Sequence, residues 1–172
     1  MNIMNLINMN GSEDEGYRYK MPVIRSRYSG SGQFTKTIIL NLEEISECIG
    51  HSKDSILKYL SYQLGTLCDM KEDSLNGSFS ERVLLDNILG YLSEFIFCDS
   101  CNIPECSLII DGKKKNIKMY KCCSACGSKN IYIPNKKMSK IYQYIIKNME
   151  NGVLYNRVKG GVSKEEDIDF DF

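Results

Sequence analysis

The chain of 172 residues has no long apolar run and only one histidine. No apolar segment approaches the roughly 18 residues that a membrane-spanning helix needs, which excludes an integral membrane protein. Residues 1–11 carry no basic side chain, and asparagines interrupt their apolar positions, so they do not form a secretory signal peptide. We therefore expect a cytoplasmic protein whose cysteines stay reduced or bind metal.

Two marks of histidine-dependent and nucleotide-dependent enzymes are also missing. The single histidine, His51, lies in an expected turn without a catalytic partner, so we do not expect it to act in catalysis. The glycine-containing stretch 29–33 is too short for a P-loop and lacks its Gly-Lys-Ser/Thr ending. We therefore do not expect the chain to bind a nucleotide directly.

Cysteine, by contrast, is abundant, and four of the eight cysteines form two Cys-x2-Cys pairs separated by 21 residues. These four are Cys98, Cys101, Cys123 and Cys126. Four thiolates at this spacing match the ligand set of one tetrahedral zinc ion. Asn102 and Gly127, which follow the two pairs, allow the chain to reverse after each. We predict one structural Zn²⁺, with disulfides or buried reduced thiols as the alternatives.

The remaining cysteines leave one ligand position open to choice. Cys122 would give a Cys-x3-Cys spacing with Cys126, whereas Cys123 gives Cys-x2-Cys-Gly and is preferred for that reason. Cys48 and Cys68 lie in helical patterns, where we expect small core residues.

The expected fold class is α+β: a small α/β sandwich followed by a four-cysteine zinc ribbon, with disordered termini. Short strands at 108–110 and 117–120 flank a lysine-rich turn, and 131–133 completes the sheet of the ribbon. The predicted boundaries are a disordered arm at 1–16, the α/β domain at 17–97, the ribbon at 98–133, a C-terminal helix at 134–152, and a linker with an acidic-aromatic tail at 153–172.

Helix signals place three helices in the α/β domain. The first runs over 42–49 after a capping box at Asn41, and the second runs from Ser52 to a stop at Gly65. The third begins with a capping box at Ser78 and has one apolar face. That face consists of Leu85, Ile88, Leu89, Leu92, Phe95 and Ile96.

The charges are segregated although the net charge is zero. Residues 1–16 and 164–172 are acidic, which leaves a formal charge of +7 on residues 17–163. A basic core favours a partner that carries phosphates, with a merely solvated basic surface as the alternative. The stretch 17–22, Tyr-Arg-Tyr-Lys-Met-Pro, interleaves aromatic and cationic side chains, which suits an exposed arm that contacts phosphates or a protein. An edge strand is the alternative for this stretch.

From residue 17 to about 148, the sequence resembles the N-terminal domain of translation initiation factor 5, a family that shares its fold with the β subunit of translation initiation factor 2. The matching stretches are Tyr-Arg-Tyr-Lys-Met-Pro at 17–22, Gly-Ser-Gly at 30–32 before Lys36-Thr37, Leu64-Gly65, Asn76-Gly77-Ser78, Phe-Ile-Phe-Cys at 95–98 through Glu105, Cys123 to Gly127, and Ile-Ile-Lys-Asn at 145–148. The first is highly specific, and the others occur in the family's order.

The resemblance implies a GTPase-activating protein, which is not itself an enzyme. Such a factor acts on the γ subunit of initiation factor 2, which carries GTP and initiator tRNA to the small ribosomal subunit during start-codon selection. Arg18 falls on the family's arginine finger, supplied in trans, and Lys36 and Lys58 fall on its two supporting lysines. The alternative is a ribosome- or tRNA-binding module without activating function, or a divergent β subunit.

Two departures from the family carry expectations of their own. The family's Gly-Asn-Gly loop is Gly-Gln-Phe here at 32–34, which puts its tRNA contact in question. The family's C-terminal helical-repeat domain, which docks on the β subunit and other initiation factors, has no counterpart in this sequence. We expect the tail 164–172 to take over part of that docking.

Overall fold

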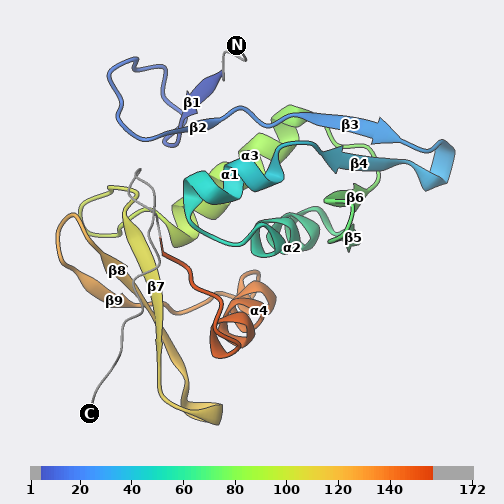
Figure 1. Ribbon diagram of the computed structural model, residues 1–172. Helices are drawn as coiled ribbons and strands as arrows, with labels where there is room; N and C mark the ends of the chain where they lie inside the picture. Colours follow the sequence, from blue (N-terminus) through green and yellow to red (C-terminus); the bar gives the residue numbers. More distant parts are fainter. Residues whose placement is uncertain (1–4, 157–172) are drawn as a thin grey trace.

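The computed structural model describes residues 5–156, which form an α+β protein with three antiparallel sheets (Figure 1). The expected sandwich and four-cysteine ribbon are both present, which confirms the predicted fold class. The strands are β1 (Leu6–Asn8), β2 (Lys20–Pro22), β3 (Ser26–Ser29), β4 (Lys36–Ile39), β5 (Cys68–Asp69), β6 (Ser74–Asn76), β7 (Cys106–Asp111), β8 (Lys118–Cys123) and β9 (Lys129–Ile131). The helices are α1 (Leu42–Ile49), α2 (Lys53–Leu64), α3 (Glu81–Phe95) and α4 (Ser139–Glu150), with short 3-10 turns at η1 (Gly32–Phe34) and η2 (Lys114–Asn116). None of these helices is long and apolar enough to cross a membrane.

The α/β part is built from the antiparallel sheet β3-β4-β6-β5 and the helices α1 to α3. The predicted start and stop of the second helix are confirmed, because the Ser52 side chain accepts a hydrogen bond from the Ser55 amide and Gly65 ends α2 in the left-handed region. Gly30 is required at the β3–β4 turn, since a Cβ at its φ of +84° would lie 2.4 Å from the carbonyl oxygen of Phe34.

Both predicted capping boxes are wrong, for the same reason. The Asn41 side chain makes no cap and instead bonds the backbone of segment 23–25 on both its oxygen and its nitrogen. Helix α3 is capped by Ser80 rather than Ser78, and Glu81 accepts from the backbone amide at the start of β3. In each case, partners distant in the sequence use a side chain that local spacing assigned to a cap.

Residues 5–16 are ordered, contrary to the disorder expected for residues 1–16. Strand β1 pairs with β2 in the register Ile7↔Met21, and the side chains of Met9 and Met21 are fully buried. Burial of these side chains in the core provides the apolar contact that the polar composition of the segment did not indicate. Residues 20–22 of the arm therefore form the strand that was the alternative prediction, while residues 1–4 lie outside the described part of the chain.

One continuous hydrophobic core joins the α/β part, the ribbon and α4. The ribbon contributes Leu108, Met119 and Tyr132 to this core. Helix α4 packs against α2, and its Tyr142 stacks on Tyr132 of the ribbon with ring centroids 5.8 Å apart. We predicted that this helix would pack on the ribbon; it packs on both, which ties the ribbon to the sandwich.

The segment after α4 is anchored, although 153–172 was predicted to begin as a linker. Tyr155 is fully buried; its hydroxyl lies 2.5 Å from Ser55 Oγ and accepts a hydrogen bond from Asn148. The backbone of Tyr155 also forms a bridge to Leu108 of β7. This residue thus connects α2, α4 and the ribbon, and the tail 164–172 lies outside the described residues.

Candidate metal centre and adjoining arm

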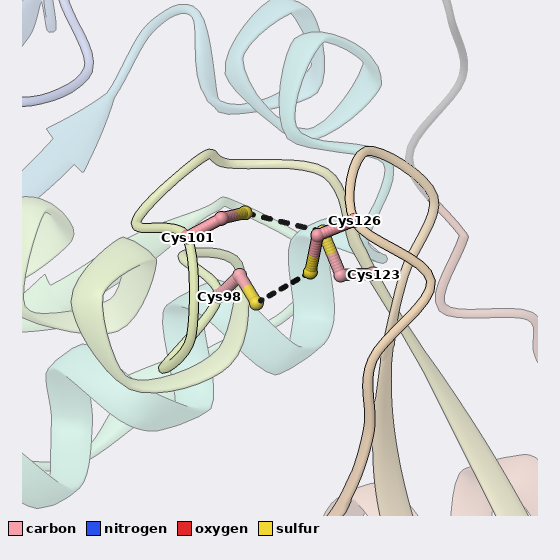
Figure 2. Close-up of side chains that lie close together, drawn as sticks. All are labelled: Cys98, Cys101, Cys123 and Cys126. Atoms are coloured by element: carbon pink, nitrogen blue, oxygen red, sulfur yellow. Dashed lines mark hydrogen bonds between the residues drawn. The ribbon is translucent and has the colours of Figure 1, made fainter.

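Four cysteine sulfurs meet at one point between the end of α3 and the ribbon sheet (Figure 2). They belong to the predicted set, Cys98, Cys101, Cys123 and Cys126, and all lie within 4.8 Å of one another. The eight cysteines are free thiols in this structure, which removes the disulfide alternative. Helix α3 delivers the first pair, and the end of strand β8 delivers the second.

The two cysteine turns have the same backbone geometry. The amide of Asn102 donates to the carbonyl of Cys98, and the amide of Gly127 donates to the carbonyl of Cys123, both at 2.9 Å. Asn102 and Gly127 have φ values of 56° and 75°, in the left-handed region that the sequence assigned to them. Each turn therefore directs two sulfurs to the same side of the chain.

The spacing of the sulfurs fits a tetrahedral zinc ion. A Zn–S bond of about 2.3 Å places two tetrahedral ligands about 3.8 Å apart. The Cys98–Cys126 and Cys101–Cys123 Sγ pairs are both separated by 3.7 Å. Cys122 lies outside the cluster because consecutive side chains on β8 point to opposite faces of the sheet, so the structure favours Cys123.

Neighbouring groups favour the thiolate form of part of this cluster. Burial acts to raise the pKa of Cys98, but hydrogen bonds from the Ser128 hydroxyl and from nearby backbone amides outweigh it and lower the pKa to about 5. The Ser128 hydroxyl also lowers the pKa of Cys126, from which its oxygen lies 3.2 Å. Burial raises the pKa of Cys101 to about 12, so its deprotonation requires a cation in the cluster.

Two residues beside the cluster were missed in the sequence. Cys106 is completely buried against Cys98 and Cys123, and burial raises its pKa to about 12, which keeps it a thiol. Lys121 is 4% exposed, and its ammonium group lies 3.0 Å from the carboxylate of Asp99, inside the first cysteine turn. The alternation along β8, which directs Lys121 to the same face as Cys123, is the signal that would have found this lysine.

The arm that carries Arg18 is tied to the second cysteine turn. The Tyr19 hydroxyl donates to Glu105 Oε1 at 2.7 Å, and the Ser124 hydroxyl donates to Glu105 Oε2 at 3.0 Å. Ser124 lies between the two cysteines of its turn, so Glu105 bridges the arm and the cluster. Tyr17 packs edge-on against Tyr19, with ring centroids 5.9 Å apart. No local sequence signal indicates this link, because 86 residues separate its two partners.

Arg18 is exposed, and its guanidinium lies 5.7 Å from the centre of the Tyr19 ring. It forms no ion pair with any residue in the described range 5–156. A planar cation held by a cation–π contact remains available to a partner's phosphate.

The structure does not bring Lys36 and Lys58 to Arg18. Lys36 begins β4 and pairs with Glu72 at 2.5 Å, and this hydrogen bond raises its pKa. The chain runs in one direction from the arm through β2 and β3 to the partner of Lys36 (Figure 1), 11 residues that span on the order of 30 Å. Lys58 lies on α2 with its ammonium over the ring of Tyr62. One phosphate group therefore cannot contact both Arg18 and Lys36 on the same chain.

His51 is part of the core. Its Nδ1 lies 2.7 Å from the Tyr91 hydroxyl, and its ring packs edge-on against Tyr91 and Tyr155. Burial lowers its pKa to about 3, so the ring is neutral at physiological pH. This environment suits a packed core histidine and offers no access to a substrate.

Comparison with known proteins assigns the chain to a family. The profile of the family described as the domain found in initiation factors 2B and 5 matches residues 9–129. Eukaryotic translation initiation factor 5 of Drosophila melanogaster is 33% identical over 84% of this chain and 31% of its own length. The factor of Saccharomyces cerevisiae is 32% identical over 83% of this chain and 35% of its length, and that of Caenorhabditis elegans is 36% identical over 66% and 26%.

The chain spans about a third of the length of these relatives. Within that third, the match contains both the arm and the cysteine cluster. The chain therefore belongs to the family of the domain found in initiation factors 2B and 5, and it is related to the N-terminal domain of translation initiation factor 5.

Proposed function

We propose that the cysteine cluster binds one structural Zn²⁺ through its four sulfurs. The 3.7 Å sulfur separations support this ligand set. Four protein ligands leave no open position for a substrate, so the ion fixes the ribbon and performs no chemistry. Four thiolates and one Zn²⁺ carry a net charge of −2, which the buried ammonium of Lys121 partly offsets.

Adjacent cysteines provide a matched test of this centre. Cys123→Ser is expected to reduce bound zinc from about one ion per chain to well below one. Cys122→Ser, one position away on the opposite face of β8, is the control and should retain full occupancy. Equal zinc content in the two variants would contradict the assignment.

We propose that the chain acts in translation initiation in the cytoplasm as a GTPase activator, supplying Arg18 in trans. The observation that carries the proposal is the exposed guanidinium of Arg18 on an arm fixed to the ribbon by Tyr19 and Glu105. The relatives that the chain matches are named translation initiation factor 5, which supports the setting. The partners implied are the γ and β subunits of initiation factor 2 with GTP, initiator tRNA and the small ribosomal subunit.

Arg18 is suited to this role by its charge and its geometry. Phosphoryl transfer spreads negative charge over the oxygens of the γ-phosphate, and a planar guanidinium can stabilise two of them at once. Arginines supplied in trans contribute roughly 10³–10⁵ in rate in known GTPase systems. The ordered position of the arm reduces the conformational entropy that would be lost when Arg18 enters another protein's active site.

The two lysines support this function from other surfaces. Lys36 has Glu72 as an ion partner and would have to leave it to contact a phosphate. Lys58 has no acidic partner in the described part of the chain. We therefore propose that both contact tRNA or protein partners rather than the γ-phosphate that Arg18 contacts. Docking of the tail 164–172 on other initiation factors remains part of the proposal.

Single-turnover GTP hydrolysis on assembled initiation complexes tests the role of Arg18. Arg18→Ala is expected to abolish stimulated hydrolysis while binding to the complex is retained, and Arg18→Lys should restore little of it. Arg27→Ala is the matched control, because Arg27 is also exposed and lies nearby on β3. Equal rates for Arg18→Ala and the wild type would favour the second candidate, a non-activating ribosome- or tRNA-binding module or divergent β subunit.

A further inference from the structure

Helices α2 and α4 bring together a group of lysines that lie far apart in the sequence (Figure 1). We call this group the α2–α4 lysine surface, and it consists of Lys58, Tyr62, Gln63, Lys136, Lys137 and Lys140. All of these residues except Lys58 line a shallow depression of about 390 Å³. The packing of α4 on α2 creates this surface, and neither segment forms it alone.

The lysines of this surface are not neutralised by neighbouring acids. Among residues 5–156, no ion pair involves Lys58, Lys136, Lys137 or Lys140. Asp54 precedes Lys58 by one helical turn but does not pair with it. Lys136, Lys137 and Lys140 are exposed, so their ammonium groups are available to an anionic partner.

Tyr62 supplies an aromatic ring within this cluster of cations. The ammonium of Lys58 lies 5.3 Å from the ring centre, and that of Lys140 lies 5.9 Å from it. The tyrosine is half-buried by packing against the core, which holds its ring in place while leaving part of it accessible. An ordered ring between two ammonium groups combines a stacking surface with two phosphate contacts.

We propose that the α2–α4 lysine surface binds single-stranded RNA, with the lysines on successive phosphates and a base on Tyr62. The type of cation separates RNA from an acidic protein as the partner. Carboxylates are recognised best by the planar fork of arginine, whereas lysine acts as a point charge that suits phosphate. All four cations here are lysines. The aromatic ring is a second feature that nucleic acid uses and a run of carboxylates does not.

This surface is independent of the proposed activating arm. Lys136, Lys137 and Lys140 belong to the α4 region, whereas Arg18 precedes β2 and is linked to the cysteine turn. RNA binding at α2–α4 can therefore fail in a variant that still stimulates GTP hydrolysis, and the converse also holds.

The test measures binding of the full chain to a fluorescein-labelled 12-nucleotide oligouridylate by anisotropy over a series of salt concentrations. We compare the wild type with Lys136→Ala/Lys137→Ala/Lys140→Ala. The expected result is at least tenfold weaker binding and a slope of log K against log salt that is shallower by about 2, because each lost phosphate contact removes about 0.7. A matched control removes the same charge from η2 with Lys113→Ala/Lys114→Ala/Lys115→Ala, which should leave binding within about twofold of the wild type.

Two further measurements identify the ligand class. Tyr62→Leu should weaken oligouridylate binding about fivefold or more through lost stacking, whereas Tyr62→Phe should retain it. Circular dichroism melting of each variant verifies that the fold is kept. Equal losses in the α4 and η2 triple variants would overturn the proposal, as would competition by polyglutamate as strong as that by unlabelled oligouridylate, which would indicate an acidic protein partner.

Discussion

The bridge between the arm and the cysteine turn predicts that Tyr19→Phe impairs activation without unfolding the protein. The substitution removes one hydroxyl that donates to Glu105 Oε1 at 2.7 Å and leaves the ring, and therefore its packing on Tyr17, in place. A hydrogen bond to a charged group contributes about 1.5–3 kcal/mol when well buried. Tyr19 is only half-buried, so we discount the contribution to about 1 kcal/mol.

A loss of about 1 kcal/mol lowers the population of the fixed arm by a factor of about 5. Single-turnover hydrolysis should therefore be about fivefold slower at subsaturating protein, a much smaller effect than that of Arg18→Ala. The melting temperature should change little, because the hydroxyl bonds a surface carboxylate rather than a core group. Tyr28→Phe is the matched control, since its hydroxyl donates to the Phe79 carbonyl at 3.2 Å on a different sheet.

A double-mutant cycle with Glu105→Gln tests whether the two groups act through each other. The amide keeps an acceptor for Tyr19 and Ser124 but loses the charge, so its single effect should be intermediate. With Tyr19→Phe in place, Glu105→Gln should cost less than it does alone. The reasoning would be refuted if Tyr19→Phe hydrolysed GTP at the wild-type rate while Arg18→Ala did not, because other contacts would then position the arm.

Three further predictions concern the core. Chelation of zinc should lower the melting temperature of the whole chain in one transition, because Leu108 and Met119 of the ribbon belong to the common core; separate melting of the ribbon would contradict this. Tyr155→Phe should destabilise the protein by about 1–2 kcal/mol in urea unfolding, since Ser55 loses its buried hydroxyl partner, and an unchanged midpoint would disprove the contact. The pKa of His51 is lowered to about 3 by burial, below its unfolded value, so stability should fall as pH decreases from about 6.5 towards 3. Urea midpoints measured at pH 6.5 and 5 should show a loss of about 1.5 kcal/mol that His51→Gln lacks; identical pH profiles would show that another group is responsible.

Local signals in the sequence determined the helices and the cysteine turns. Ser52 and Gly65 bound α2 because a hydroxyl cap and a residue free to adopt positive φ act within one turn of the chain. Asn102 and Gly127 fixed the cysteine turns for the same local reason. The spacing of the cysteines was sufficient to predict that their sulfurs converge, because a tetrahedral site imposes its own geometry on four ligands.

Long-range contacts decided the rest. Met9 makes the N-terminal segment part of the core, and Tyr155 does the same for a segment expected to be a linker, because each finds its apolar or polar partners on elements distant in the sequence. The sequence alone pointed to Arg18 and to the cysteines as separate features. Only the tertiary structure joined them, through Tyr19 and Glu105, since no local periodicity encodes a hydrogen bond between residues 86 positions apart. It likewise separated Lys36 from Arg18, because the strands between them are extended and keep their ends apart.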